Sequence, residues 1–506
     1  MAQVGNQTRR LLTVLLSIAA LRRFATQTRR PRQMALCLSL FFSFLVCAPA
    51  AQLRRGRVLN DTVADVPAAS EELLPPRFRQ ELDNHWDLQY TANITVGGQE
   101  VSAVLDSGSF ELLVFSDRCE ACGDVGLYSD AKSSTFSRTA LEAEHRFGSG
   151  TTKSSEAFED LAVGPLSTTG QHFWEVIEAD MNILSDGFFH AILGVGPPKS
   201  AGRFADINAQ SARSTDPDAD NLQQVAAQTA KYPGFLQSAN VPSYSVCFGK
   251  EPRSPGYFVW NDDAVEREPA KFTSLKVDTD DYYWSSTMTS SKIGSPENLE
   301  ATIVDLGCGA SGDDGCRAVF DTGSSLLAAP REAVNAIQGI LDAWENDGNC
   351  SDLSGLPEIQ FELDGRQFSL PPEAYVGQVE GHIDDALLEF MPQLKQDVDT
   401  DSMSACKVLI MVMEDDPEFS STWVLGMPFF RKYYTSFILN TTTAEPSSVA
   451  LAPADDECEP TDAADSLLRK ASTENPHTAM HLDAARIRAP KMKPRRVRKA
   501  VALADA

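Results

Sequence analysis

The sequence predicts a β-rich fold built from two similar lobes that share a central cleft. In residues 318–327, an apolar strand-like run leads into Asp-Thr-Gly-Ser and then resumes. A second copy of this pattern lies 215 residues upstream, in residues 104–113. Each copy is followed later by an apolar-apolar-Gly run, at residues 192–194 and 424–426. Two equivalent lobes, each presenting one carboxylate to the shared cleft, explain all three observations.

The two carboxylates, Asp106 and Asp321, lie in an unusual local context. A carboxylate between hydrophobic flanks is costly to desolvate unless polar neighbours support it. Gly108 and Gly323 allow a sharp turn and a close approach of the backbone. The neighbouring hydroxyl groups can donate hydrogen bonds. A single copy is equally well explained as a turn between buried strands, but the repeat with its later apolar-Gly runs is not.

Seven short segments together resemble the pepsin-family (A1-type) aspartic proteases, over about residues 86–453. They are residues 315–327, 356–361, 370–375, 423–426 and 449–453 in the second half, and residues 133–136 and 147–150 in the first. The resemblance implies an all-β-dominated, bilobal fold with a central cleft. It also implies an endopeptidase that hydrolyses polypeptides at acidic pH, works as a monomer, and requires no cofactor and no metal.

The resemblance assigns a role to each residue of the two repeats. Asp106 and Asp321 would form a catalytic dyad that activates a water molecule. Ser109 and Ser324 would hydrogen-bond the outer carboxylate oxygens, and Ser107 and Thr322 would bond across the lobe interface. The glycines at 108 and 323 would allow the close approach. A hairpin made of Phe147, Gly148, Ser149 and Gly150 would form the flap that closes over substrate.

The flap departs from the family pattern at two positions. The family usually has a tyrosine where this chain has Phe147, and a tryptophan that hydrogen-bonds it where this chain has Leu113. Losing both partners of a hydrogen bond costs far less than losing one, so we expect an apolar contact in its place. The alternative function is a non-catalytic, peptide-binding relative with an altered flap. A structural β-sandwich with two incidental turns does not explain the later apolar-Gly runs.

Charge is distributed unevenly along the 506 residues. The net charge is −27, but residues 1–57 contain ten Arg and no Asp or Glu, and residues 58–458 carry a formal charge of −41. A body this acidic repels polyanions, which argues against nucleic-acid binding. Its self-repulsion eases as carboxylates protonate, which suits an acidic compartment. An acidic surface that serves solubility alone is the other interpretation.

The first 51 residues resemble a leader with a signal peptide. Apolar runs at residues 11–21 and 35–51 both follow arginines, and the second ends in a small-x-small site at residues 48–50. Met34 is an alternative start, and a signal anchor or a two-step organelle address are alternative interpretations. The resemblance implies a secreted or vacuolar protein without a stable membrane span. It also implies that residues 52–85, which hold five arginines, are an activation prosegment, although an ordinary linker fits their composition equally well.

Eight cysteines lie outside the leader, and an even count behind a signal peptide suggests disulfides. The resemblance implies the pairs Cys119–Cys122, Cys308–Cys316 and Cys350–Cys406, and leaves Cys247–Cys458 as the fourth. A Cys-x-x-Cys can also be a zinc knuckle or redox pair, but no second Cys/His pair is spaced to complete a metal site. Glycosylation sequons begin at Asn60, Asn93, Asn349 and Asn440.

The expected domain boundaries follow from these features. Residues 86–262 form the N-terminal lobe and residues 263–458 the C-terminal lobe. Within the first lobe, residues 199–231 have no apolar period and indicate a surface insertion. In the second, apolar spacing after Pro330 predicts an amphipathic helix over residues 331–344. Residues 459–506 read as a basic, disordered tail.

Overall fold

The computed structural model describes residues 75–487 with gaps, all within one compact unit that spans residues 71–506. The gaps are residues 120–121, 124–127, 212–218, 280, 295–302, 309–314, 345–349, 384–386, 396–403, 414–420 and 463–478. The predicted leader, most of the predicted prosegment, Asn60, Asn349 and residues 488–506 therefore lie outside the described residues.

The largest sheet has 13 strands in the order β11-β23-β22-β9-β10-β1-β2-β3-β8-β4-β7-β6-β5. The strands are β1 (Phe78–His85), β2 (Gln89–Val96), β3 (Gln99–Asp106), β4 (Leu112–Phe115), β5 (Ser137–Phe147), β6 (Gly150–Val163), β7 (Leu166–Met181), β8 (Ala191–Gly194), β9 (Ser243–Phe248), β10 (Gly256–Trp260), β11 (Thr273–Lys276), β22 (Tyr433–Leu439) and β23 (Pro446–Pro453). Strand β1 pairs with both β10 and β2, so it joins the first-half strands to a group that includes the late strands β22 and β23.

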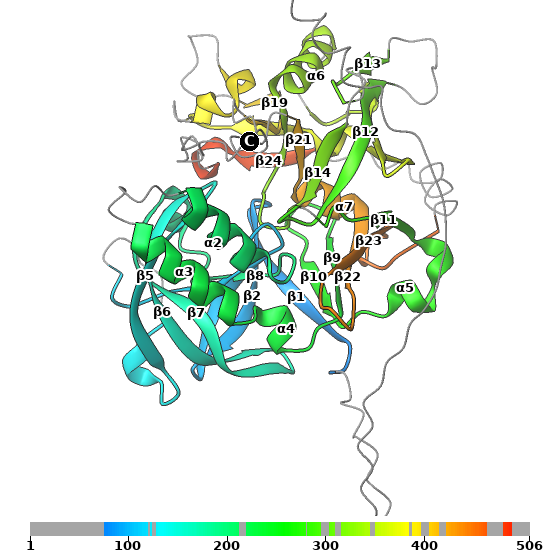
Figure 1. The fold of residues 1–506 in the computed structure, drawn as a ribbon. Helices are drawn as coiled ribbons and strands as arrows, with labels where there is room; N and C mark the ends of the chain where they lie inside the picture. Colours follow the sequence, from blue (N-terminus) through cyan, green and yellow to red (C-terminus); the bar gives the residue numbers. More distant parts are fainter. Residues whose placement is uncertain are drawn as a thin grey trace, which may run out of the picture. The chain divides into compact units, whose positions relative to one another are not determined.

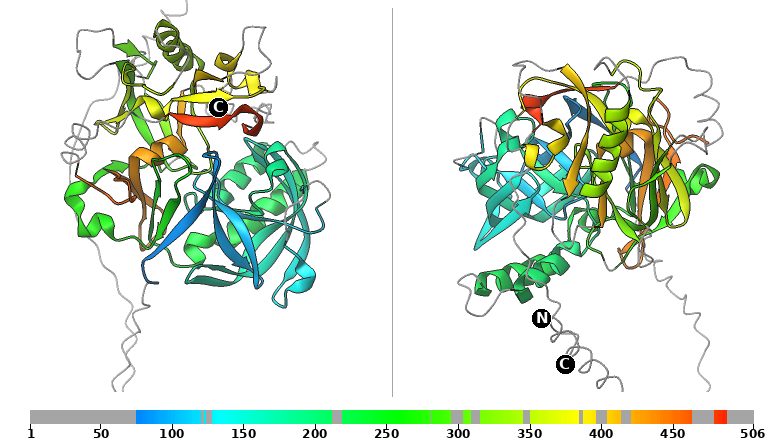
Figure 2. Two further views of the ribbon diagram at one scale, coloured as in Figure 1. Left: turned by 180° about the vertical axis from the view of Figure 1, so that it is seen from behind. Right: turned by 90° about the horizontal axis from the view of Figure 1, so that it is seen from above.

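The second half builds two smaller sheets. One has the order β17-β16-β12-β14-β21-β15-β20, with β13 paired to β12, and the other has the order β19-β18-β24. The strands are β12 (Ser285–Gly294), β13 (Val304–Asp305), β14 (Cys316–Phe320), β15 (Leu327–Pro330), β16 (Glu358–Leu363), β17 (Arg366–Leu370), β18 (Val376–Glu380), β19 (Ser404–Val408), β20 (Ile410–Met413), β21 (Thr422–Leu425) and β24 (Met480–Asp483). The predicted β-rich, two-lobed fold is confirmed (Figures 1 and 2).

The described helices are few and mostly short. They are α2 (Ser200–Ser211), α3 (Ala219–Lys231), α4 (Phe235–Ser238), α5 (Ala264–Arg267), α6 (Arg331–Ala343) and α7 (Met427–Lys432). Helix α6 confirms the helix predicted from apolar spacing, because Val334, Ile337 and Leu341 are buried along one face. The insertion at residues 199–231 forms two helices, α2 and α3, which pack against each other beside the strands of the first lobe (Figure 1).

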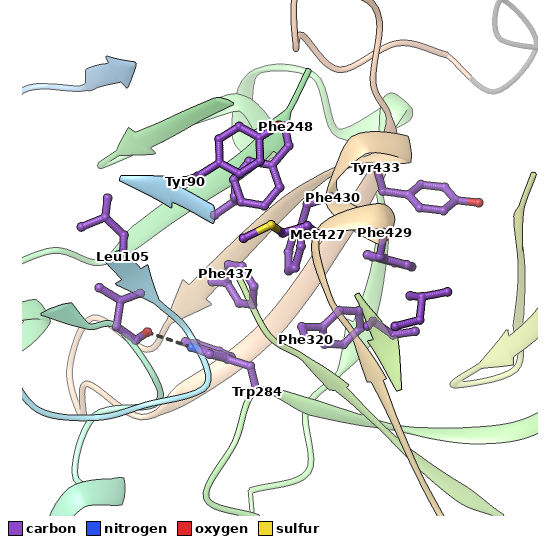
Figure 3. Packing of buried hydrophobic residues seen from close by; sticks show 14 of the residues in the cluster. Tyr90, Leu105, Phe248, Trp284, Phe320, Met427, Phe429, Phe430, Tyr433 and Phe437 are labelled. Carbon is purple, nitrogen blue, oxygen red and sulfur yellow. Dashed lines mark hydrogen bonds between the residues drawn. The ribbon is translucent and has the colours of Figure 1, made fainter. Parts of the chain in front are cut away.

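Apolar strand residues from both halves pack into one continuous core. Four tryptophans are fully buried, and the core includes Leu105 and Phe320, the residues immediately before Asp106 and Asp321. Figure 3 shows these two side chains with Trp284, Phe437 and other aromatic residues of the same cluster. Because each aspartate follows a residue fixed in this core, its backbone position is set by packing on one side.

The C-terminal tail contradicts the prediction of disorder over residues 479–487. Strand β24 pairs in parallel with β18, and Met480, Leu482 and Ile487 are buried in a cluster that also contains Leu326. Figure 2 shows β24, in red, beside the yellow strands of its sheet. The prediction was wrong because the basic composition of the tail hid a short alternation of apolar residues that is long enough to add one strand.

Four disulfide bonds are present, and they are the four expected pairs: Cys119–Cys122, Cys247–Cys458, Cys308–Cys316 and Cys350–Cys406. Two of the sequon asparagines, Asn93 and Asn440, are described and exposed. Among the described residues, no helix has the length and apolar character needed to cross a membrane.

Candidate active site

The two aspartates occupy equivalent positions in the two halves. Asp106 ends β3, and Asp321 directly follows β14. Strand β3 pairs in parallel with β8, where Asp106 faces Gly194, and β14 pairs in parallel with β21, where Phe320 faces Leu425. The two apolar-Gly runs found in the sequence are therefore the strands that flank the two aspartate strands, as the repeat predicted.

The two aspartate loops are joined by reciprocal hydrogen bonds between the halves. The amide of Ser107 donates to Oγ1 of Thr322 at 2.9 Å, and the amide of Thr322 donates to Oγ of Ser107 at 2.9 Å. Each hydroxyl then donates to a carbonyl of the opposite strand, from Ser107 to Phe320 at 2.9 Å and from Thr322 to Leu105 at 2.7 Å. Both side chains are buried, so this predicted contact is held away from water.

Close approach across the interface requires the two glycines. A Cβ built on Gly108 would lie 2.5 Å from Oδ1 of Asp321, and one built on Gly323 would lie 2.5 Å from Oδ1 of Asp106. No side chain fits at that separation, so each carboxylate lies directly against the glycine that follows the other aspartate. The structure thus brings the two predicted carboxyl groups together.

Hydrogen bonds support both carboxyl groups. The amides of Gly108 and Gly323 donate to Oδ1 of Asp106 and of Asp321, at 2.8 and 2.9 Å. Oγ of Ser324 donates to the second oxygen of Asp321 at 2.7 Å, as expected. The equivalent Oγ of Ser109 is buried, and its interaction with the Asp106 carboxyl lowers the pKa of Asp106 against the effect of burial.

Electrostatics set Asp106 apart from an ordinary aspartate. Burial, together with the charge of Asp321, raises the pKa of Asp106 to about 7. Both causes act against the ionised form, because desolvation and a neighbouring negative charge each make a carboxylate less stable. Among the described residues, no group of three or more His, Cys, Asp or Glu side chains is arranged to bind a metal ion.

The predicted flap residues form the tip of a hairpin. Strands β5 and β6 are antiparallel, Phe147 faces Gly150 in the register, and the turn consists of Gly148 and Ser149. Phe147 packs against an apolar cluster in which Leu113 is 1% exposed. This is the apolar contact expected in place of the family's tyrosine–tryptophan hydrogen bond.

Three residues in or beside this cluster carry polar groups that contact one another, and the sequence analysis did not identify them as part of the site. They are Glu111, His145 and Trp174, which contact one another close to the aspartate loop of the first half. The available signal was the position of Glu111, a charged residue within an otherwise apolar run after Ser109.

Comparisons with known proteins agree with this architecture. A family model described as eukaryotic aspartyl protease matches residues 89–450. Pepsin A of Rhinolophus ferrumequinum is 27% identical over 71% of this chain and 80% of its own length. Pepsin A of Bos taurus is 27% identical over 71% of this chain and 83% of its own, and Renin-2 of Mus musculus is 27% identical over 70% and 78%.

Two β lobes that each present an aspartate loop at a common interface define a bilobal aspartic peptidase fold. The family match covers more than half of the chain and includes both loops. The chain therefore belongs to the eukaryotic aspartyl protease family, and the protein is an aspartic endopeptidase that acts on polypeptides.

Proposed function

We propose that Asp106 and Asp321 form the catalytic dyad of this endopeptidase and that it works in acid. The supporting observation is that each carboxylate lies against the glycine of the other half. A side-chain Cβ at either glycine would come within 2.5 Å of the facing carboxylate oxygen. This proximity supports the proposal because two carboxyl groups held this close share one proton in aspartic proteases. The ionised group is then the base and the protonated group is the acid.

The reaction follows from this protonation state. The ionised carboxylate takes a proton from a water molecule as the water oxygen attacks the carbonyl carbon of the peptide. The protonated carboxyl gives its proton to the carbonyl oxygen, which leaves a tetrahedral diol. The diol collapses when a carboxyl proton passes to the amide nitrogen and the C–N bond breaks, and the dyad returns to one shared proton.

The test is cleavage of a denatured protein by the purified enzyme between pH 3 and pH 9. We expect activity in acid and its loss as the pH rises through about 7, because the dyad then gives up its shared proton. The same titration affects stability. A carboxyl with a raised pKa stabilises the folded state when it is protonated, so this contribution is complete below a pH of about 4 and lost by about 7.

Two controls define the reaction class. A transition-state peptide inhibitor should abolish cleavage at one inhibitor per enzyme molecule, and a chelator should leave the rate unchanged. Cleavage that survives the inhibitor would contradict the proposal. The non-catalytic alternative, a peptide binder with an altered flap, is not supported by the comparisons and predicts no cleavage at any pH.

We further propose that the protein enters the secretory pathway as a precursor, with residues 52–85 as its activation segment. The four disulfides support an oxidising compartment. The five arginines of this segment can pair with carboxylates of the acidic body at neutral pH, and such pairs loosen as the carboxylates of the body protonate. Its last residues, 78–85, are strand β1 of the large sheet.

The precursor model predicts shortening of the N-terminus in acid. The full-length chain should gain activity after incubation at pH 4 but not at pH 7. N-terminal sequencing should locate the cut before Arg77, so that residues 77–85 of the segment, which include β1, stay with the body. Arg77 forms an ion pair at 3.0 Å with the buried Asp262, which ties the start of β1 to the residues that follow β10. Equal activity at both pH values with an intact N-terminus would contradict the activation role.

A further inference from the structure

An ionisable side chain lies at the base of the flap hairpin, where the surrounding residues are apolar. Glu111 is in the loop between Asp106 and β4, and its side chain is only 20% exposed. The indole Nε1 of Trp174 donates to Oε1 of Glu111 at 2.6 Å, and Nε2 of His145 lies 3.5 Å from Oε2. The two rings also contact each other, with centroids 5.1 Å apart. One carboxylate therefore accepts a hydrogen bond from one ring and lies within ion-pair distance of the other.

These three residues come from three parts of the site. The backbone of Glu111 is fixed by Gly194, whose amide donates to the Glu111 carbonyl at 3.0 Å and which faces Asp106 in the sheet. His145 lies on β5, two residues before Phe147 and on the same face of the strand. Trp174 lies on β7 and is fully buried. The carboxylate thus connects the Asp106 loop with the strand that leads to the flap tip.

The surroundings of Glu111 stabilise its ionised form. Burial alone would raise the pKa of Glu111, but the hydrogen bond and charge of His145, together with donation from Trp174, outweigh burial and lower it. The next ionisable pair is His172 and Glu156, 3.1 Å apart, with the His172 ring against Trp174. Among the described residues this second pair makes no hydrogen bond to the Asp106 loop and reaches Glu111 only through the charge of His172, so it provides a comparison within the same sheet.

The geometry points to Glu111 as a positioning residue that holds the flap hairpin at residues 147–150 in register with the Asp106 loop. This inference rests on the proposed catalytic function. The packing of Phe147 against the apolar cluster has no preferred direction, whereas a carboxylate that accepts from Trp174 on one strand and pairs with His145 on another fixes both distance and angle. Removing the carboxylate also leaves the buried Trp174 indole without its acceptor.

The test compares kcat and KM for Glu111→Leu, Glu111→Gln, Trp174→Phe and the double variant that combines Glu111→Leu with Trp174→Phe. The active sites of each variant are counted by titration with a tight-binding transition-state peptide inhibitor. Glu111→Leu should lower kcat per titrated site by about 10- to 100-fold, because a small misplacement of site elements costs that much. Glu111→Gln should recover most of it, because its carbonyl oxygen still accepts from Trp174. Trp174→Phe removes the indole donor. Adding Glu111→Leu to Trp174→Phe should lower kcat per titrated site only slightly further.

Glu156→Gln is the matched control, because it changes another buried Glu–His pair of the same sheet. It should lower the melting temperature and leave kcat per titrated site unchanged. A wild-type kcat in Glu111→Leu, or multiplicative losses in the double variant, would overturn the inference. If Glu111→Leu does not fold, the kcat values of Glu111→Gln and Trp174→Phe relative to wild type still test the inference, because Glu111→Gln keeps the hydrogen bond to Trp174 and Trp174→Phe removes it. An inactive wild-type enzyme would contradict the proposed function instead.

Discussion

Replacing Asp321 with asparagine is expected to lower kcat/KM by at least about 10³-fold, since general acid–base chemistry contributes effects of this size. Asparagine is nearly the same shape as aspartate but can neither hold nor release the shared proton. Its carbonyl oxygen can still accept from the Gly323 amide, and the Ser324 hydroxyl can rotate to accept from its amide group. The loss should therefore come from chemistry rather than from unfolding. Cleavage of a denatured protein at pH 4 measures it.

Asp106→Asn should show the same loss, because the dyad needs both carboxyl groups. The matched control is Asp263→Asn, which changes an aspartate that is 49% exposed and pairs with Arg267 on one helical turn. This control should retain wild-type activity. Far-ultraviolet circular dichroism and thermal melting confirm that all three variants are folded. Turnover in Asp321→Asn within about tenfold of wild type would remove the proposed mechanism.

Replacing Arg431 with methionine is expected to lower the free energy of unfolding by about 3–5 kcal/mol, the usual cost of stranding a buried charge. Arg431 lies on α7, and its guanidinium contacts Oδ1 of Asp87 at 3.1 Å, with the two side chains 9% and 1% exposed. Asp87 sits between β1 and β2, so the ion pair ties the first strands to a late helix. Without Arg431, the Asp87 charge keeps the half-exposed guanidinium of Arg253 at 3.7 Å and donors such as the Arg253 amide at 3.0 Å. Urea unfolding at pH 6 measures the change.

The exposed ion pair between Arg267 and Asp263 provides the comparison. Its side chains are 50% and 49% exposed, so Arg267→Met should change stability by no more than about 0.5 kcal/mol. Adding Asp87→Asn to Arg431→Met should recover part of the loss, because the stranded charge is then removed. A loss below about 1 kcal/mol in Arg431→Met would show that the pair is not the main link between these elements.

The sequence was sufficient to predict the parts of the protein that repeat. The spacing around Asp106 and Asp321 predicted two lobes and the later apolar-Gly strands, and the family resemblance predicted the cross-lobe contact of Ser107 with Thr322. Repetition carries this information because each half must solve the same problem of placing a carboxylate beside a hydrophobic core. The helix at residues 331–344 was predicted for a different reason, since amphipathic spacing is a local property of the chain.

Features that depend on single, distant partners could not be predicted. Glu111 becomes significant only when β7 brings Trp174 beside it and β5 brings His145, and neither pairing has a signal in the sequence. The β24 strand escaped detection because four residues in a basic tail give little periodicity, although β18 supplies the partner that makes them a strand.

The position of β24 has a consequence for recombinant production of this enzyme. The family match ends at residue 450, inside β23 and before Cys458. A fragment trimmed there would carry a free thiol at Cys247 and would expose the backbone edge of β18, a template for intermolecular association. The autonomous folding unit is longer than the homologous segment, and an expression boundary at or beyond Ile487 keeps it whole.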